Sequence, residues 1–447
     1  MNIVICGAGQ VGSHAAEVLA AAGHNITVID LDIGRVRAIE DSFDVRVLQG
    51  NCATAEILRE AGCPDADLLI AATENDETNL ITASIASGIG EGKTICRVHH
   101  ATYFEQRGLD YGAHFSVDHF ICPEYSTSLA IARMLRNPGA IAIENFARGQ
   151  IEMHEFEVTD KAAAVGVSLA KLGLPAGTRL AAITRDKRMF IPDGASVVEP
   201  GDAIVLVGNA NMFQQARKLF HGQELGRRRV AIMGGPSMAV WLCRALKERD
   251  FSIRLFEIRR QRAEELAEKL SWITVLQGDP TDKAVFDEEK LGQADAFVAL
   301  LDDDEHNILG CAWAKSMGVR QAVAVVQRPD YLHLLESVGI DRAFSPRMVA
   351  VKEIERFMES GSLRRMASLA EGEIDVYWCH VSPSARMAGM ALRDIKLSPD
   401  WVVAAIQRVD HVHVPGAEDI VRAGDTLLVI GRHGQERKLR KLFGAGS

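Results

Sequence analysis

The sequence predicts an α/β protein made of two tandem repeats. Each repeat is expected to consist of a Rossmann-like, doubly wound parallel sheet followed by a small α+β unit. From residue 1 to about 122, short runs rich in Val, Ile and Leu alternate with amphipathic stretches, which is typical of parallel strands covered by helices on both faces. The same pattern recurs from about residue 230, and a chain of 447 residues has room for several domains.

The duplication is visible in the spacing of corresponding residues. The spacing from Gly7 to Gly234 equals the spacing from Asp30 to Glu257. A spacing longer by a single position relates Asp76 to Asp304, Asn79 to Asn307 and Tyr103 to Tyr331. A third spacing, slightly shorter than both, relates Pro123 to Pro346, Pro192 to Pro415 and Asp202 to Asp425. Near-constant spacing over so many pairs indicates two copies of one architecture.

The elements of the first repeat follow from its apolar runs. Strands are expected at 3–6, 26–30, 45–50, 68–73, 94–98 and 115–118, and then a helix from Pro123 to about Arg136 that Asn137, Pro138 and Gly139 break. The small unit is expected to have strands at 151–159, 179–186, 188–194 and 203–209, with a helix near 168–174.

The predicted domains are therefore residues 1–145 and 226–368 for the two Rossmann-like lobes, and 146–225 and 369–447 for the two small units. The polar stretch 221–229, which contains glycine and three consecutive arginines, is expected to be a solvated linker between the repeats.

Composition excludes several classes of function. A net charge of −10 argues against a general nucleic-acid binder, which needs a basic surface. The eight cysteines lie singly in mostly apolar runs without the spacing of a zinc site, so they are expected to be reduced and buried, and no metal site is predicted. With neither a secretory signal nor an apolar run long enough to span a bilayer, the protein is expected to be cytoplasmic.

The segment GAGQVG at residues 7–12 has the features of a phosphate-binding turn. Gly7 permits the tight turn, Gly9 lets the backbone approach a diphosphate, and Gly12 allows close helix packing. Asp30 ends the next strand, where a carboxylate accepts hydrogen bonds from ribose hydroxyls. An acidic residue there favours NAD, NADH or an adenine nucleotide over NADP, although Arg35 nearby leaves a 2′-phosphate contact open.

The second copy of this turn reads GGPSMA. Pro236 replaces the middle glycine and removes a backbone donor, so weak or no dinucleotide binding is expected there. Glu257 keeps the position that corresponds to Asp30 and could still contact a ribose; the alternative is a relic that only maintains the fold.

Acidic segments follow the fourth strand of each lobe, at the sheet edge where such folds bind ligands. The run from Asp302 to Glu305 suggests helix capping first and a divalent cation second. Arg97 ends the fifth strand at the same edge, where it could reach a phosphate or form a structural salt bridge.

Catalytic groups are not evident. No tyrosine has a lysine four residues later, no P-loop motif occurs, and the small units show no cluster of His, Arg and Asp. We therefore predict a protein that is not an enzyme and has no catalytic residues. An NAD-dependent oxidoreductase is the alternative.

The GAGQVG turn, VIDLD at 28–32, GNCAT at 50–54, TENDETN at 73–79 and CRV at 96–98, all within a duplicated frame, resemble the TrkA family. These are regulatory subunits of Trk-type potassium uptake systems, built from two RCK (KTN) units, each with a Rossmann N-lobe and a C-lobe. The resemblance implies an NAD, NADH, ATP or ADP site. Its residues would be Gly7, Gly9, Gln10, Val11, Gly12, Asp30, Asp76 and Arg97.

The resemblance further implies a homo-oligomeric ring, expected to be a tetramer, docked on the inner face of the plasma membrane beneath a membrane-embedded Trk-type potassium channel subunit. Nucleotide occupancy would rearrange that ring. The helices that begin at Pro123 and Pro346 would exchange contacts between lobes and neighbours. A regulator of a different cation transporter is a second alternative.

Overall fold

The computed structural model describes most of the chain. The described residues are 1–104, 108–136, 140–146, 151–186, 188–209, 212–221, 227–247, 251–358, 363–369, 373–398, 400–408, 411–434 and 436–443. They form two compact units. One combines Met1–Leu135 with Gly226–Met358, and the other combines Arg136–Leu225 with Glu359–Ser447.

The first lobe is a parallel sheet in the order β3-β2-β1-β4-β5-β6. Its strands are β1 (Asn2–Cys6), β2 (Asn25–Asp30), β3 (Arg46–Gln49), β4 (Leu68–Ala71), β5 (Lys93–Arg97) and β6 (His119–Ile121). Its helices are α1 (Gln10–Ala21), α2 (Ile33–Ser42), α3 (Ala55–Glu60), α4 (Asp76–Ile89), α5 (Tyr111–Phe115) and α6 (Pro123–Arg136). The strand order reverses between β1 and β4, and open α/β sheets generally bind ligands at the carboxyl ends of the strands beside such a point.

The second lobe repeats this topology in the order β14-β13-β12-β15-β16-β17. Its strands are β12 (Arg228–Met233), β13 (Phe251–Glu257), β14 (Thr274–Gln277), β15 (Ala296–Ala299), β16 (Gln321–Val325) and β17 (Arg342–Phe344). Its helices are α8 (Ser237–Leu246), α9 (Arg260–Lys269), α10 (Lys283–Glu288), α11 (Asp304–Ser316), α12 (Leu332–Leu335) and α13 (Pro346–Met358). The duplicated Rossmann-like architecture is thus confirmed.

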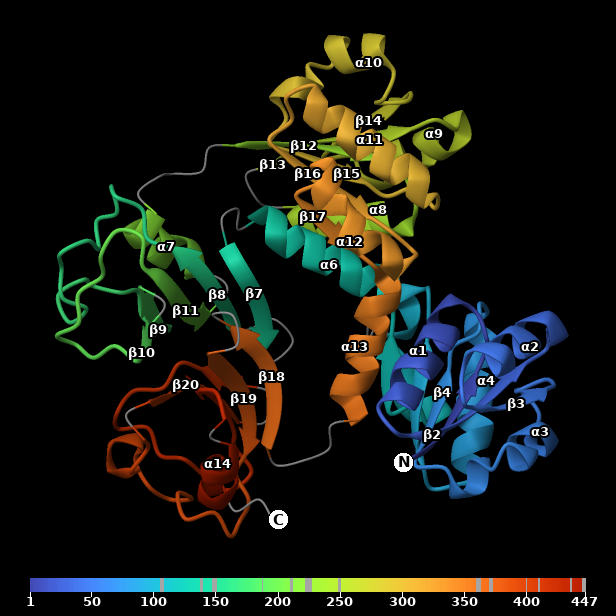
Figure 1. Ribbon diagram of the computed structural model, residues 1–447, viewed down its shortest axis with the longest axis horizontal. Helices are drawn as coiled ribbons and strands as arrows, with labels where there is room; N and C mark the ends of the chain where they lie inside the picture. Colours follow the sequence, from blue (N-terminus) through green and yellow to red (C-terminus); the bar gives the residue numbers. More distant parts are fainter. Residues whose placement is uncertain are drawn as a thin grey trace. The chain divides into compact units, whose positions relative to one another are not determined.

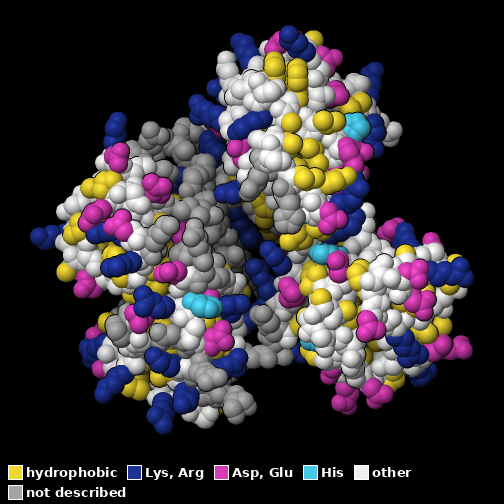
Figure 2. All heavy atoms as spheres, viewed as in Figure 1, with side chains coloured by type: hydrophobic (Ala, Val, Ile, Leu, Met, Phe, Trp, Pro, Cys, Tyr) yellow, Lys and Arg dark blue, Asp and Glu magenta, His cyan; other side chains and the backbone are white. Residues whose placement is uncertain are grey.

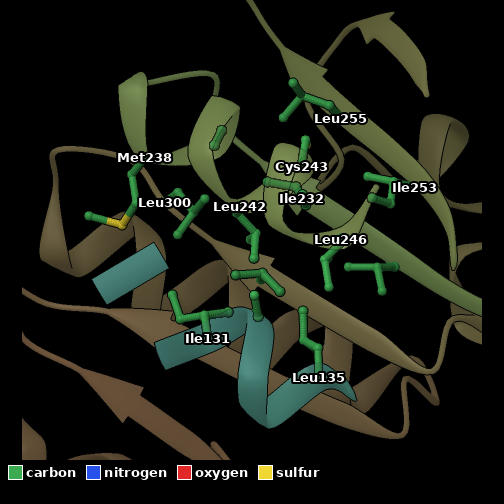
Figure 3. Packing of buried hydrophobic residues seen from close by; sticks show 14 of the residues in the cluster. Ile131, Leu135, Ile232, Met238, Leu242, Cys243, Leu246, Ile253, Leu255 and Leu300 are labelled. Atoms are coloured by element: carbon green, nitrogen blue, oxygen red, sulfur yellow. The ribbon is translucent and has the colours of Figure 1, made fainter. Parts of the chain in front are cut away.

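The last helix of each lobe packs on the other lobe (Figure 1). Ile131 and Leu135 of α6 are fully buried in one core cluster with α8 and the sheet of the second lobe, as Figure 3 shows. Ile354 of α13 is fully buried in the core cluster of the first lobe, together with residues of α1. This exchange joins the two lobes through apolar surface.

Truncation of the exchanged helix α13 tests this packing. Ile354→Ala is expected to lower the free energy of unfolding by about 2–5 kcal/mol, because the cavity would open inside a core shared by two lobes. Lys352→Ala on the same helix lies at an exposed position and should change it by less than about 0.5 kcal/mol. Urea denaturation measures the free energy of unfolding of both variants. Equal losses in Ile354→Ala and Lys352→Ala would contradict the packing of α13 in the core of the first lobe.

The small units are antiparallel sheets in the orders β10-β9-β11-β8-β7 and β18-β19-β22-β20-β21. The first contains β7 (Ala140–Phe146), β8 (Ile151–Glu157), β9 (Thr178–Arg185), β10 (Arg188–Phe190), β11 (Ala203–Asn209) and α7 (Phe213–His221). The second contains β18 (Leu363–Leu369), β19 (Ile374–His380), β20 (Trp401–Arg408), β21 (His411–His413), β22 (Thr426–Arg432) and α14 (Glu436–Phe443). Buried residues of both sheets share one core cluster.

An ion pair between a partly exposed arginine and a buried aspartate recurs at the same place in both small units. Arg185 donates to Asp202 at 2.8 Å, and Arg408 donates to Asp425 at 2.7 Å, while each aspartate is 1% exposed. A buried carboxylate needs such donors, which explains why both copies have an aspartate at this position.

Three local expectations were wrong. The sixth strand begins at His119 rather than 115, because Tyr111–Phe115 forms α5. Residues 169–171 form a turn instead of part of a helix. Arg228 opens strand β12 and is buried, donating a hydrogen bond to the Leu135 carbonyl, so it is not part of a solvated linker. Residues 137–139 and 222–226 lie outside the described residues.

The expectation for the cysteines is confirmed, since all eight are free and buried. Within the described part of the chain, no helix has the length and apolar character required to cross a bilayer. Acidic and basic side chains are intermingled on the face of the first lobe in Figure 2.

Candidate functional site

The glycine turn between β1 and α1 is shaped by steric requirements at two of its glycines. Gly7 has φ of +105°, and a Cβ there would lie 2.8 Å from the Ala72 carbonyl oxygen. A Cβ on Gly12 would lie 1.8 Å from the Gly7 carbonyl oxygen. Only glycine fits at either position. The turn therefore brings strand and helix together as the motif predicts.

Gly9 differs, because it faces open space. The nearest described atom to a Cβ on Gly9 would be Arg35 Nη1, at 3.7 Å. Gly9 is also the N-cap residue of α1 and provides no side-chain cap, so the first N–H groups of the helix have no side-chain acceptor from that residue. Unsatisfied N–H groups at a helix start attract anions. A nucleotide diphosphate fits this observation.

Asp30 is held beside the turn by two backbone donors. Its Oδ2 accepts from the Ala8 N–H at 2.6 Å, and its Oδ1 accepts from the Asp32 N–H at 2.8 Å. The side chain is half-buried. A carboxylate has about four acceptor positions, so this anchored group can still accept from ribose hydroxyls.

Gln10 and Val11 begin helix α1 but face different surroundings. The Gln10 residue is exposed, whereas Val11 is 2% exposed and belongs to the core cluster of the first lobe. Val11 can therefore contribute only its backbone N–H to a ligand. Arg35, which lies near Gly9, pairs with Glu74 at 3.4 Å on the surface.

Arg97 forms a salt bridge within its own lobe. Its Nη2 lies 3.0 Å from Glu124 Oε1 on α6 and 3.0 Å from His99 Nε2. The Arg97 side chain is 12% exposed, and among the described residues its buried Nε has no hydrogen-bond partner. Arg97 thus links the edge of the sheet to the exchanged helix, and its free Nε leaves one donor for a ligand.

Asp76 holds the loop after β5. Its oxygens accept from the N–H groups of His99 and His100 and lie 2.9 Å from Nδ1 of each imidazole. Burial alone would raise the pKa of Asp76, but the hydrogen bonds from His99 and His100 outweigh it and hold the pKa well below its usual value. Both oxygens of Asp76 are engaged, so Asp76 fixes the orientation of the loop after β5. A ligand that contacts this loop would need it to be held in one position.

The lowered pKa of Asp76 predicts a pH dependence. Because the folded-state pKa lies below the unfolded value of about 4, the contribution is present at neutral pH and is lost as pH falls below about 4. Asp76→Asn should lower the free energy of unfolding by about 2 kcal/mol at pH 7, with a smaller deficit at pH 3. The exposed control Asp65→Asn should have almost no effect. A deficit in Asp76→Asn that is independent of pH would contradict the assignment.

The second glycine turn is occupied by its own side chains. Glu257 is 6% exposed and accepts from the Gly235 N–H at 3.3 Å and from Arg259 Nε at 3.1 Å. Burial would raise the pKa of Glu257, but the hydrogen bonds and charge of Arg259 lower it. A Cβ on Gly235 would lie 2.4 Å from Leu266 Cδ1. The second turn thus resembles the first in its backbone arrangement, but it lacks the open space that lies over Gly9. A contact between Glu257 and a ribose stays a prediction.

The acidic run of the second lobe caps a helix, as expected. Asp303 is the N-cap of α11 and accepts from the His306 N–H at 2.8 Å. In the first lobe, Asn75 caps α4 in the same way. Among the described residues, no group of three or more His, Cys, Asp or Glu is arranged to hold a metal ion.

Two residues near the first site were not predicted, namely Glu124 and Arg347. Glu124 pairs with Arg97, while Arg347 of α13 donates from Nε to Gln10 Oε1 at 3.2 Å. The sequence contains one signal for them, because each directly follows the proline, Pro123 or Pro346, that begins the last helix of its lobe. Their opposite charges are visible only once the two copies are aligned on those prolines.

Family models match most of the chain. The TrkA-N domain model matches residues 3–123 and 230–346, and the TrkA-C domain model matches residues 153–221 and 376–444. A Trk system potassium uptake protein TrkA homolog of Archaeoglobus fulgidus is 32% identical over 443 residues, covering 99% of this chain and 100% of the relative. The Trk system potassium uptake protein TrkA of Vibrio alginolyticus is 31% identical over 437 residues, covering 96% and 95%.

Solved structures share the fold. The crystal structure of the GsuK RCK domain superposes with a TM-score of 0.62 at 16% identity, covering 99% of this chain and 95% of that one. The GsuK channel bound to NAD gives the same TM-score and identity, covering 99% and 79%. At this identity the likeness concerns the arrangement of the elements.

Proposed function

This chain belongs to the TrkA family, and we propose that it is a nucleotide-sensing regulatory subunit that gates a Trk-type membrane potassium uptake system. The observation that carries the proposal is the first glycine turn, open over Gly9 and flanked by the anchored carboxylate of Asp30. The relatives named above are potassium uptake proteins, which supports the choice of transported ion.

The proposed ligand is NAD, NADH, ATP or ADP, bound in the first lobe. Gly7 and Gly12 shape the turn, Gly9 and the N–H groups of Gln10 and Val11 face the phosphates, and Asp30 accepts from the ribose. Arg97 offers its free Nε to a phosphate, and Asp76 orients the loop beside it. The relatives named above are potassium uptake proteins, which supports a role in binding without turnover.

The proposed mechanism is a shift between two arrangements of an oligomer. A ligand shifts such an equilibrium only through different affinities for the two states, and a change from 1:99 to 99:1 requires about 5.5 kcal/mol. Several sites in a homotetrameric ring can supply this together. The exchanged helices α6 and α13 support the proposal, because movement of one lobe must move the core of the other.

The proposed location is the cytoplasmic face of the plasma membrane, where the ring would dock on a membrane-embedded potassium channel subunit. Potassium selectivity would then lie in the partner's pore. The test is co-reconstitution with the Trk-type membrane subunit of the same organism in potassium-loaded vesicles. Flux that changes with nucleotide and depends on Asp30 is expected. Flux indifferent to every nucleotide, or steady oxidation of NADH by the protein alone, would contradict the proposal.

A further inference from the structure

Arg347 joins the second lobe to the phosphate turn of the first. It lies at the second position of α13, and its Nε donates to Gln10 Oε1, which is far away in the sequence. Gln10 is the first residue of α1, directly after Gly9. A guanidinium from the second lobe is therefore held at the helix start where an anion would bind.

The internal repeat explains why this arginine is available. In the first lobe, Arg97 at the end of β5 pairs with Glu124 on α6 at 3.0 Å. The corresponding residues of the second lobe are Val325, at the end of β16, and Arg347, directly after the proline that begins α13. The copy has thus lost the strand arginine and reversed the charge on the helix. The second copy therefore keeps one arginine, Arg347, at this place. It has no carboxylate in the role that Glu124 has for Arg97 in the first copy.

Arg347 forms no direct ion pair with a carboxylate of a described residue, although two acidic residues act on it through their charge. The residue is half-buried, and no carboxylate of a described residue lies within ion-pair distance of it. Burial lowers the pKa of Arg347, the charge of Asp304 opposes this shift, and the smaller effects of Arg328 and Asp330 lower and raise it, respectively. A partly desolvated guanidinium without a carboxylate gains by meeting a phosphate, to which it can donate two parallel hydrogen bonds.

We propose that Arg347 binds the phosphate chain of the nucleotide in the first lobe, so that the second lobe reads the charge of that ligand. The inference rests on the proposed nucleotide site and adds to it a specificity residue from the other copy. Because α13 also packs in the core of the first lobe, the contact couples phosphate charge to the position of the exchanged helix. Ligands with more phosphate charge would engage Arg347 more strongly than a nucleoside.

The test compares ATP with adenosine by isothermal titration calorimetry in magnesium-free buffer. Arg347→Gln is expected to weaken ATP binding about tenfold, or about 1.4 kcal/mol, and to leave adenosine binding unchanged. Arg347→Lys keeps the positive charge but lacks the planar guanidinium group. Its affinity for ATP should therefore lie between those of the wild type and Arg347→Gln. The matched control Lys352→Gln removes a charge from an exposed position of the same helix and should change neither affinity.

The outcomes separate this inference from the proposed site. An unchanged ratio of ATP to adenosine affinity in every folded Arg347 variant would overturn the role of Arg347, even if Asp30→Ala abolishes binding of both ligands. Full retention of both ligands by Asp30→Ala would instead contradict the proposed site. Melting without ligand is recorded first, so that a purely structural role, which lowers the melting temperature and leaves the ratio unchanged, is recognised.

Discussion

Gly12→Ala is expected to lower the free energy of unfolding by about 4 kcal/mol, near the upper end of the range for single substitutions. The methyl group would lie 1.8 Å from the Gly7 carbonyl oxygen, which belongs to backbone held between β1 and α1. Neither element can shift without opening the core cluster that contains both. Chemical denaturation of the isolated protein measures the effect.

Gly9→Ala is the matched comparison within the same turn. Its methyl group would meet only Arg35 Nη1, at 3.7 Å, so the free energy of unfolding should change by no more than about 1 kcal/mol. The methyl would nevertheless occupy the space through which a diphosphate approaches the backbone, and nucleotide affinity should fall at least about tenfold. If Gly9→Ala bound nucleotide like the wild type, the phosphates would not lie at this turn.

Asp30→Ala is expected to weaken nucleotide binding about 100-fold, which corresponds to about 2.7 kcal/mol. The carboxylate is already oriented by the N–H groups of Ala8 and Asp32. Two charge-assisted hydrogen bonds from ribose hydroxyls would therefore form without reorganisation and would be lost together. A thermal shift series with NAD, NADH, ATP and ADP reports the loss as missing stabilisation of the variant.

The repeat provides the control for this prediction. Glu257 occupies the corresponding position in the second lobe, but its carboxylate is paired with Arg259. Glu257→Gln should therefore leave nucleotide-dependent stabilisation unchanged. If Glu257→Gln and Asp30→Ala lost the same stabilisation, the two lobes would bind nucleotide alike.

The fold could be predicted from the sequence because its signals are local. Continuous apolar runs such as LLIA at 68–71 are fully buried strands, and Pro123 opens α6 where periodicity and the proline place a helix start. Gly7 and Gly12 could be assigned from the motif, since the positive φ of Gly7 and the close approach of Gly12 to the Gly7 carbonyl oxygen are properties of the turn itself. The helix expected at 168–174 failed because its apolar residues pack in an irregular segment of the small unit.

The remaining features depend on contacts between distant segments. Periodicity marks α6 and α13 as amphipathic, but it does not say that each helix buries its apolar face in the other lobe. The engagement of Asp76 by His99 and His100 and the pairing of Arg97 with Glu124 are likewise set by how the loop after β5 folds back. The closing of the second turn by Glu257 and Leu266 also becomes visible only in three dimensions.

The central claim is that the first lobe alone binds an adenine nucleotide and returns it unchanged. Equilibrium dialysis with labelled nucleotide, followed by chromatography of the released ligand, tests this most directly. We expect one equivalent bound per chain, recovered intact, and an affinity about 100-fold lower in Asp30→Ala. Two equivalents per chain, wild-type affinity in Asp30→Ala, or recovery of a converted nucleotide would contradict the claim.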